Sequence, residues 1–410
     1  MSPDFTLDKH FWRNFTKTYW DRKPTVIKSP FRAPIVTPRE VFRGVVTACQ
    51  RLRERTNDFT LIIGDRRIVM EKDLARCLPR AKDGSIECYH ARLKRAGETG
   101  ELGVSLNDIQ VELGWNFLTR LRQFLKGLYE IEGVPARAEA VLFLGDYSRT
   151  HEGVHRDTGS VFCFVVDGTK RMRLWPADGV KSCSPRRGPG PREDYPEHSL
   201  CLEGQPGDVI YWPASYWHVA ESDGRMVTSL SIAVHYGYSL FNAMAEDIAA
   251  WSGKIIGHKY DPVGALPFSG PQVSPELASL AKRVEGESGG LAQRLTRFWM
   301  DQTTGYGFGS VPPPRPFVPL RSRRQVRTDP ILPILYGRFG KELVVSTNGH
   351  SIVAPYDRDV VNLIRTLRRG AVHTLSDLLK VRRRKQVIAS RKAVRKTLDF
   401  LLNERAVEYV

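Results

Sequence analysis

Between residues 138 and 238, hydrophobic and polar positions alternate in short runs. The apolar runs are EAVLFLGDY, SVFCFVVDG, KRMRLW, GDVIYWPASYWHVAES and MVTSLSIAVHYGY, and glycine, aspartate and proline separate them. Short β-rich runs bounded by turn residues at this spacing are typical of an antiparallel sandwich or barrel. Within this region, the pair Asp167-Gly168 predicts a β-hairpin. We therefore expect a strand-built core in the middle of the chain.

Helical spacing dominates on both sides of this region. FWRNFTKTYWDRKPTVIKS predicts a helix followed by an extended segment, and LNDIQVELGWNFLTRLRQFLKGLYEIEG predicts a long helix that Gly133 and Pro135 end. After the core, FNAMAEDIAAWSG and SPELASLAKRVEGESGGLAQRLTRFWMDQ predict further helices. The predicted fold class is α+β.

The pattern of the last quarter of the chain predicts a separate domain. GYGFGSVPPPRPFVPLRSRRQVRTDP is typical of a semi-rigid linker, and the helices and short terminal strand after it suit a winged-helix-like domain. We expect these segments: 1–135, a helical and extended region that completes the core; 136–240, the core; 241–305, a helical connector with homodimer formation as one candidate role; 306–330, the linker; 331–410, the basic winged-helix-like domain.

The net charge also differs between the last quarter of the chain and the rest. The formal net charge is +17, and residues 315–410 hold 21 Lys and Arg against 8 Asp and Glu, which leaves 41 against 37 for the rest. The run Arg382 to Lys385 and the nearby Arg391, Lys392, Arg395 and Lys396 suit nucleic acid or an acidic partner. A solvated helical face explains them equally well.

Cysteine and hydropathy patterns bear on the compartment. The six cysteines, at positions 49, 77, 88, 163, 183 and 201, form no CxxC pair, which argues against a zinc finger and a disulfide scaffold. No apolar stretch is long enough to span a bilayer, and the N-terminus has no apolar signal region. We expect a cytoplasmic protein with no membrane partner.

One set of residues has the pattern of a metal site. In His155-Arg156-Asp157, residues two apart on an extended segment face the same side, and His218 follows on a later strand. Two imidazoles and one carboxylate on one face leave coordination positions open, as non-haem Fe(II) oxygenases require for a co-substrate and O₂. A structural zinc site normally closes the shell with cysteines instead.

Lys170 is the next candidate. By alternation along KRMRLW, Lys170 shares the inward face with Met172 and Leu174. A lysine on an apolar face needs an anion to offset its desolvation, and the distal carboxylate of 2-oxoglutarate suits it. Alternatively, the side chain reaches solvent, as lysines at strand starts commonly do.

HRDTGSVFCFVVDGTKRMRLWP and GDVIYWPASYWHVAESDGRMVTSLSI together resemble the core of JmjC/cupin-type protein hydroxylases, which include asparaginyl and ribosomal-protein hydroxylases. In that family a Lys or Arg fifteen residues after the first motif histidine binds 2-oxoglutarate, and Lys170 stands at this distance from His155. FWRNFTKTYWDRKPTVIK is more loosely similar to the family's N-terminal start. Some relatives have Thr three residues before the histidine, where this chain has Glu152.

The resemblance implies a double-stranded β-helix (jelly-roll) core with flanking helices, and Fe(II) bound by His155, Asp157 and His218. It implies a dioxygenase that hydroxylates an amino-acid side chain of a protein or peptide while 2-oxoglutarate is decarboxylated to succinate. A peptide natural-product precursor is one such substrate. The alternatives are an N-methyl-lysine demethylase, which uses the same chemistry, and a nucleic-acid-binding regulator whose barrel senses a ligand.

Several neighbouring residues have less specific patterns. His151 and His235 lie close to the motifs, but we leave both outside the metal set, since a histidine at the end of a β run is more often a packing or substrate-side residue. Tyr147, Trp212 and Trp217 are candidates for lining a substrate cleft, although aromatic residues at strand spacing usually belong to the core.

Overall fold

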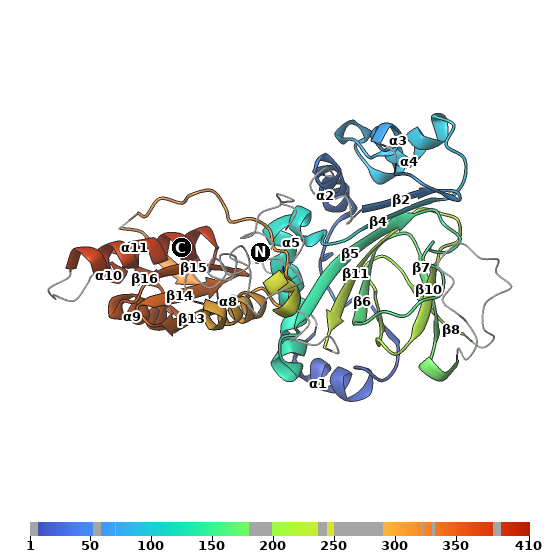
Figure 1. Cartoon of the computed structure of the whole chain (residues 1–410). Coiled ribbons are helices and arrows are strands. Elements are labelled where there is room, and N and C mark those ends of the chain that lie inside the picture. The colour runs from blue at the N-terminus through green and yellow to red at the C-terminus, as the bar shows by residue number, and fades with distance from the viewer. Residues whose placement is uncertain are drawn as a thin grey trace, which may run out of the picture. The chain divides into compact units, whose positions relative to one another are not determined.

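The structure is a computed structural model of the chain, and it describes residues 7–51, 59–69, 71–179, 199–236, 244–249, 290–321, 323–329, 333–379 and 387–410. They fall into two compact units: unit 1 comprises residues 1–237 and 308–313, and unit 2 comprises residues 238–307 and 314–410. Helices and antiparallel strands occur in both units (Figure 1), so the α+β prediction is confirmed.

The strands of unit 1 form two antiparallel sheets, of which β5, β11 and β6 lie side by side and face β7, β10 and β8 (Figure 1). The larger sheet has the order β1-β9-β6-β11-β5-β4-β2-β3 and the smaller one β10-β7-β8. The bounds are β1 Thr25–Ile27, β2 Phe59–Ile63, β3 Arg66–Arg67, β4 Leu102–Leu106, β5 Arg137–Gly145, β6 Ser160–Asp167, β7 Lys170–Trp175, β8 Leu200–Gly204, β9 Val209–Trp212, β10 Trp217–Glu221 and β11 Val227–His235.

Inward side chains of both sheets pack into one core. Val161 and Cys163 from β6 and Ile210 from β9 meet Met172 and Leu174 from β7, and all five are buried. Because side chains alternate along each strand, every second residue enters this interior. The predicted jelly-roll core is confirmed.

The Asp167-Gly168 turn joins the two sheets. Gly168 has a φ of +72°, as a tight turn at glycine requires. However, β6 pairs with β9 and β11, whereas β7 pairs with β8 and β10. The expected hairpin is therefore wrong, because an Asp-Gly pair specifies a tight turn and not the pairing of its flanking strands.

Helices of unit 1 cover the outer side of the larger sheet. On α1 and α5, Trp12 and Phe124 pack against Phe162 of β6 with ring centroids 6.3 and 5.3 Å away. Gly133, with a φ of +83°, ends α5 as predicted. The helix bounds are α1 Lys9–Thr18, α2 Pro38–Gln50, α3 Glu71–Cys77, α4 Ile86–Arg95 and α5 Gln110–Glu132, with single 3₁₀ turns at Ala81–Asp83 and Ala177–Gly179.

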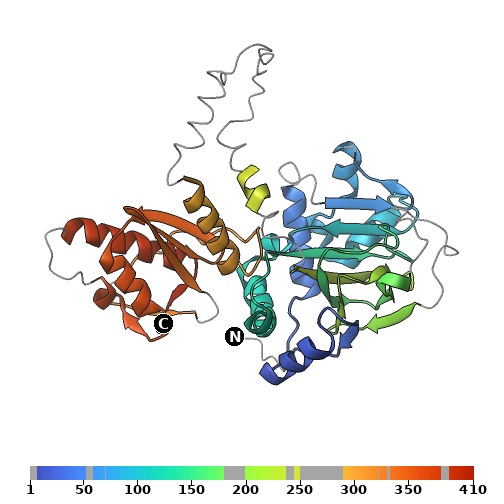
Figure 2. The same ribbon diagram turned by 60° about the horizontal axis from the view of Figure 1, so that its bottom comes forward.

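Unit 2 has two small sheets, β13-β14-β15 and β16-β12-β17, with helices packed around them (the orange and red segments of Figure 2). The helices α9 and α11 share a buried core that includes Val360, Ile364, Leu398 and Leu401. The bounds are α8 Gly290–Thr304, β12 Gln325–Thr328, β13 Ile334–Phe339, β14 Glu342–Thr347, β15 His350–Pro355, α9 Arg358–Leu367, β16 His373–Thr374, α10 Leu375–Leu378, α11 Val387–Asn403 and β17 Val407–Tyr409.

Three sequence features fall outside the described residues. They are the Pro/Gly/Arg-rich connection 181–196, most of the helical connector within 250–289, and the basic run Arg382 to Lys385. Across the described part of the chain, no helix has the length and apolar character needed to cross a membrane.

Candidate metal centre and its pocket

The main chain brings His155 and His218 together. The two residues face each other in an antiparallel bridge: the N–H of His155 donates to the carbonyl of His218 at 3.0 Å, and the N–H of His218 donates back at 2.8 Å. His218 lies on β10, and His155 lies on the extended segment before β6. Directly opposite residues carry their side chains on the same face. Both imidazoles are thus on one wall of the barrel.

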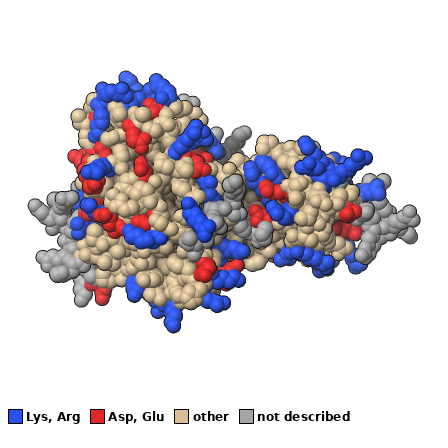
Figure 3. Space-filling model, turned by 180° about the vertical axis from the view of Figure 1, so that it is seen from behind, with Lys and Arg blue, Asp and Glu red and all other residues tan. Residues whose placement is uncertain are grey.

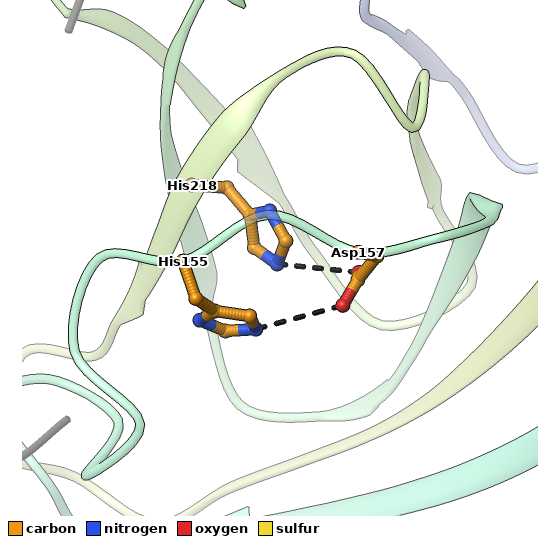
Figure 4. A group of neighbouring side chains, drawn as sticks. All are labelled: His155, Asp157 and His218. Atoms are coloured by element: carbon orange, nitrogen blue, oxygen red, sulfur yellow. Dashed lines mark ion pairs between the residues drawn. The ribbon is translucent and has the colours of Figure 1, made fainter. Parts of the chain in front are cut away.

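Asp157 completes the group predicted from the sequence (Figure 4). One carboxylate oxygen lies 3.6 Å from Nε2 of His155 and the other lies 3.4 Å from Nε2 of His218. The three potential ligand atoms all lie within 4.8 Å of one another, and this is the one such group found among the described residues. Neither His151 nor His235 belongs to it.

A main-chain carbonyl lies beside Nδ1 of each imidazole. Nδ1 of His155 lies 3.0 Å from the carbonyl of Gly153, and Nδ1 of His218 lies 3.4 Å from that of Tyr216. An Nδ1–H that donates to a carbonyl leaves the lone pair on Nε2, which is the atom that faces Asp157. Burial lowers the pKa of His218 to about 4, against the weaker opposing effect of Asp157, so this imidazole stays neutral as a ligand must.

The donor set fits Fe(II). Two neutral imidazoles and one carboxylate from one side match the facial arrangement of non-haem iron oxygenases, and no cysteine takes part. A cavity of about 130 Å³ adjoins the three side chains, so the opposite side of the site is open to further ligands. Apolar residues, including Val141, Val161 and Trp212, line this cavity together with polar ones.

Lys170 points into the same cavity, as alternation along β7 predicts. The residue is only 1% exposed, and its Nζ donates to the hydroxyl of Tyr147 at 2.7 Å and lies over the ring of Phe143. No described carboxylate is recorded within ion-pair distance of this ammonium. Burial raises the pKa of Tyr147, so its hydroxyl keeps a proton that it can donate. Lys170 and Tyr147 thus place an ammonium and a phenol hydroxyl next to each other at this cavity.

Glu152 also lines the cavity, at the position where some relatives have Thr. Its carboxylate lies 3.0 Å from Nε2 of His151. Burial alone raises the pKa of Glu152, but the hydrogen bond and charge of His151 outweigh it, and the net direction is down. The cavity thus has an ionised carboxylate where a hydroxyl stands in those relatives.

The three aromatic candidates have different positions. Trp212 lines the cavity, with its ring centroid 5.0 Å from that of His218. Tyr147 contacts Lys170 through its hydroxyl, a role that aromatic spacing alone did not reveal. Trp217 is not among the cavity-lining residues, and the guanidinium of Arg156 covers its ring.

Sequence reasoning also missed a polar group at the cavity wall. His235 on β11 lies 3.2 Å from a carboxylate oxygen of Glu139 on β5 and 3.1 Å from the hydroxyl of Thr158. All three residues line the cavity, although 96 positions separate Glu139 from His235. Only the pairing of β5 with β11 makes them neighbours.

Comparisons with known proteins agree with this architecture. Residues 120–244 match the JmjC domain model. A structure of the ribosomal oxygenase YcfD from Escherichia coli aligns over 100% of this chain and 99% of its own, with 15% identity and a TM-score of 0.51. An X-ray structure of E. coli YcfD covers 100% of both chains, with 14% identity and a TM-score of 0.50.

The E. coli protein has also been solved in complex with cobalt and 2-oxoglutarate; that structure covers 99% of both chains, with 15% identity and a TM-score of 0.49. No curated protein sequence matches this chain. Residues 120–244 form a JmjC domain, and they contain His155, Asp157, Lys170 and His218. The predicted JmjC/cupin fold is confirmed.

Proposed function

We propose that this JmjC protein is an Fe(II)- and 2-oxoglutarate-dependent oxygenase that hydroxylates an amino-acid side chain of a protein or peptide. The observation that carries the proposal is one cavity with the His155, Asp157 and His218 ligand atoms on its wall and the buried ammonium of Lys170 inside it. The E. coli relative is a ribosomal oxygenase, solved with cobalt and 2-oxoglutarate, which supports the same cofactors and a protein substrate here.

In this proposal, Nε2 of His155, Nε2 of His218 and the Asp157 carboxylate hold the iron. Bound Fe(II) would supply the oxidising chemistry: O₂ and 2-oxoglutarate would give succinate and CO₂, with one oxygen atom of O₂ in the succinate and the other on the substrate. The carbonyls of Gly153 and Tyr216 hold the imidazoles in the ligating tautomer.

Lys170 and Tyr147 bind the far carboxylate of 2-oxoglutarate. The ammonium supplies charge, and the phenol supplies a second donor at a fixed place, because Lys170 already donates to its oxygen. The buried apolar wall formed by Val161 and Trp212 keeps water away from the reacting atoms. The protein thus acts mainly by positioning the reactants.

The test is an anaerobic titration of the whole chain with Fe(II) and then 2-oxoglutarate, followed by the visible charge-transfer absorption of the chelate. We expect the band in the wild type, its loss in Asp157→Ala and a weaker band in Lys170→Ala. Asp223→Ala, which changes an aspartate outside the cavity, serves as the control. A folded wild type that forms no band contradicts the proposal.

The reaction product distinguishes side-chain hydroxylation from demethylation. With peptides as substrates, mass spectrometry distinguishes the gain of one oxygen atom from the loss of a methyl group as formaldehyde. The first result supports side-chain hydroxylation, including that of a natural-product precursor, and the second supports N-methyl-lysine demethylation.

A second candidate function is nucleic-acid binding by unit 2. On α11, Arg391, Lys392, Arg395 and Lys396 are exposed, whereas the intervening Ala393 and Val394 are buried. Lys and Arg side chains are numerous on the surface of both units in the view of Figure 3. A helix with one basic exposed face, following the short helix α10, suits the phosphate backbone of a duplex.

A duplex-binding titration at several salt concentrations tests this second function. Binding that weakens steeply with salt, and that the change of these four residues to Gln removes, supports it. Unchanged oxygenase activity in the same variant assigns the two functions to separate sites. An absence of binding at low salt contradicts it.

A further inference from the structure

A chain of three polar side chains leads from the surface of β5 into the cavity. Glu139 Oε1 lies 3.2 Å from Nε2 of His235, and Nδ1 of the same imidazole lies 3.1 Å from Oγ1 of Thr158. Thr158 directly follows Asp157 and is itself exposed at the cavity. The three residues therefore connect a buried imidazole to a hydroxyl that an incoming substrate can reach.

The imidazole in the middle of this chain is held in place from several sides. His235 is 4% exposed, and a methyl group added at Gly159 would lie only 2.7 Å from its Nδ1, so the ring packs directly on that backbone. Arg137 is the direct cross-strand partner of His235 and donates to the other carboxylate oxygen of Glu139 at 3.0 Å. Both ends of the Glu139 carboxylate are thus fixed.

The Glu139 carboxylate determines which nitrogen of His235 donates to it. Burial alone would raise the pKa of Glu139, but the hydrogen bond from His235 and the charge of Arg137 outweigh it, and the net direction is down. Glu139 is therefore ionised, and an ionised carboxylate can only accept hydrogen bonds. Nε2 of His235 must then carry a proton, and in the form of the ring that has a single proton Nδ1 is an acceptor. In that form the hydroxyl of Thr158 donates its only hydrogen to Nδ1, 3.1 Å away.

We propose that Thr158 offers its oxygen solely as a hydrogen-bond acceptor, so that the site selects substrates which present a hydrogen-bond donor, N–H or O–H, beside the metal ligands. The inference rests on the proposed oxygenase function and adds the chemical class of group that its substrate must carry. Thr158 is the binding residue, whereas His235 and Glu139 are positioning residues that set its polarity. A group that only accepts hydrogen bonds finds no donor on Thr158.

The first test reads the tautomer directly. In ¹⁵N NMR spectra of the full chain loaded with Zn(II), we expect the signals of His235, assigned by their loss in His235→Asn, to show the Nε2–H form. In Glu139→Gln, Arg137 retains the amide oxygen and the amide nitrogen donates to His235, so we expect the Nδ1–H form. An Nδ1–H form or a doubly protonated ring in the wild type, or no change in Glu139→Gln, overturns the proposal. Glu203→Gln, an exposed position away from the cavity, is the control.

The second test measures the selectivity with two small probes. Acetamide has N–H donors and N,N-dimethylacetamide has none, and the ¹³C-methyl signal of Thr158 reports the binding of each to the Zn(II)-loaded protein. We expect acetamide to bind roughly fivefold more tightly in the wild type, which corresponds to one neutral hydrogen bond. The preference should vanish in Glu139→Gln, in which Thr158 regains a free donor.

Two substitutions of Thr158 complete the second test, and the NMR chemical shifts of neighbouring methyl groups report the binding of the amides. Thr158→Ser retains the hydroxyl and should keep the preference, whereas Thr158→Val should lose it. Equal response to the two amides in the wild type, including no response to either, overturns the inferred selectivity. Neither test requires turnover, so a failure of the oxygenase proposal, seen as a missing Fe(II) chelate band, is distinguished from a failure of this one.

Discussion

His155 and His218 are hydrogen-bonded to each other through their main chains, and their ring centroids are 4.3 Å apart. The peptide groups, not the side chains, set the distance between these two proposed ligands. Strand pairing therefore builds most of the site before any metal binds, and a substitution that retains the peptide groups should leave this arrangement intact.

We therefore expect His155→Ala to lose metal affinity without losing the fold. The bridge to His218 survives in alanine, and the side chain of His155 is only half-buried, so the free energy of unfolding should change by about 1 kcal/mol or less. The affinity for Co(II) should fall roughly a hundredfold or more. Metal titration and thermal melting measure the two effects, with His151→Ala as the matched control. Wild-type affinity in His155→Ala would exclude this residue as a ligand.

A second prediction concerns the effect of the buried Lys170 on the free energy of unfolding. A buried ammonium whose recorded partner is one hydroxyl opposes folding in the absence of an anion. Lys170→Met should therefore raise the free energy of unfolding by about 1 kcal/mol or more. The same change should weaken 2-oxoglutarate binding roughly tenfold to a hundredfold, because a charge-assisted hydrogen bond is lost.

Denaturant unfolding and 2-oxoglutarate titration separate these two effects. Tyr147→Phe is the matched variant: it removes one hydroxyl and leaves the charge, so it should weaken binding less and should not stabilise the protein. Tight 2-oxoglutarate binding by Lys170→Met would show that the anion binds elsewhere.

The sequence predicted the parts of the site that depend on local spacing. His155 and Asp157 are two residues apart on an extended segment, and Lys170 alternates with Met172 and Leu174, whose burial the structure confirms. A period of two is a property of the strand itself, so it can be recognised without the tertiary fold.

Contacts between distant strands could not be predicted in this way. The hydroxyl of Tyr147 reaches Lys170 across 23 residues, and His235 meets Glu139 only because β11 pairs with β5 in one register. The Asp167-Gly168 turn shows the same limit, since its local chemistry gives a turn while the sheet order decides which strands pair. Such contacts depend on topology, which no local pattern contains.

Acid sensitivity should arise in part from Asp208. This buried carboxylate accepts hydrogen bonds from the N–H of Gln205, from Lys28 and from the N–H of Ser29, at 2.9, 2.8 and 3.1 Å. Burial alone raises the pKa of Asp208, but these three donors outweigh it and the net direction is down. Ionised Asp208 therefore stabilises the fold above the ordinary pKa of an aspartate, and this stabilisation is lost as pH falls through the lowered value.

Asp208→Asn should remove this dependence and destabilise the protein by about 1–3 kcal/mol at neutral pH, with a smaller difference from the wild type in acid. Urea unfolding at several pH values measures it. Lys28→Met is the control: Lys28 is 65% exposed, so the loss of its ion pair should cost about 1 kcal/mol or less. An Asn variant whose stability falls in acid as steeply as that of the wild type would assign the dependence to other groups.

Gly127 on α5 makes room for the ring of Trp12. A methyl group at this position would lie 2.0 Å from Cδ1 of Trp12, which is buried and packs against Phe124 and Phe162. In an unobstructed helix, Gly→Ala stabilises by roughly 0.5–1 kcal/mol, but here the clash should reverse the sign and destabilise by about 1–3 kcal/mol. Denaturant unfolding of Gly127→Ala measures the net effect.

The Trp12→Leu background separates the clash from helix propensity. This change destabilises the protein by itself because it leaves a cavity. Once the indole is gone, the added methyl group meets no ring, so Gly127→Ala should become neutral or stabilising in that background. A coupling between the two changes of about 1 kcal/mol or more is the expected result of the double-mutant cycle. Equal destabilisation in both backgrounds would mean that the glycine serves the backbone of α5 and not the packing of α1.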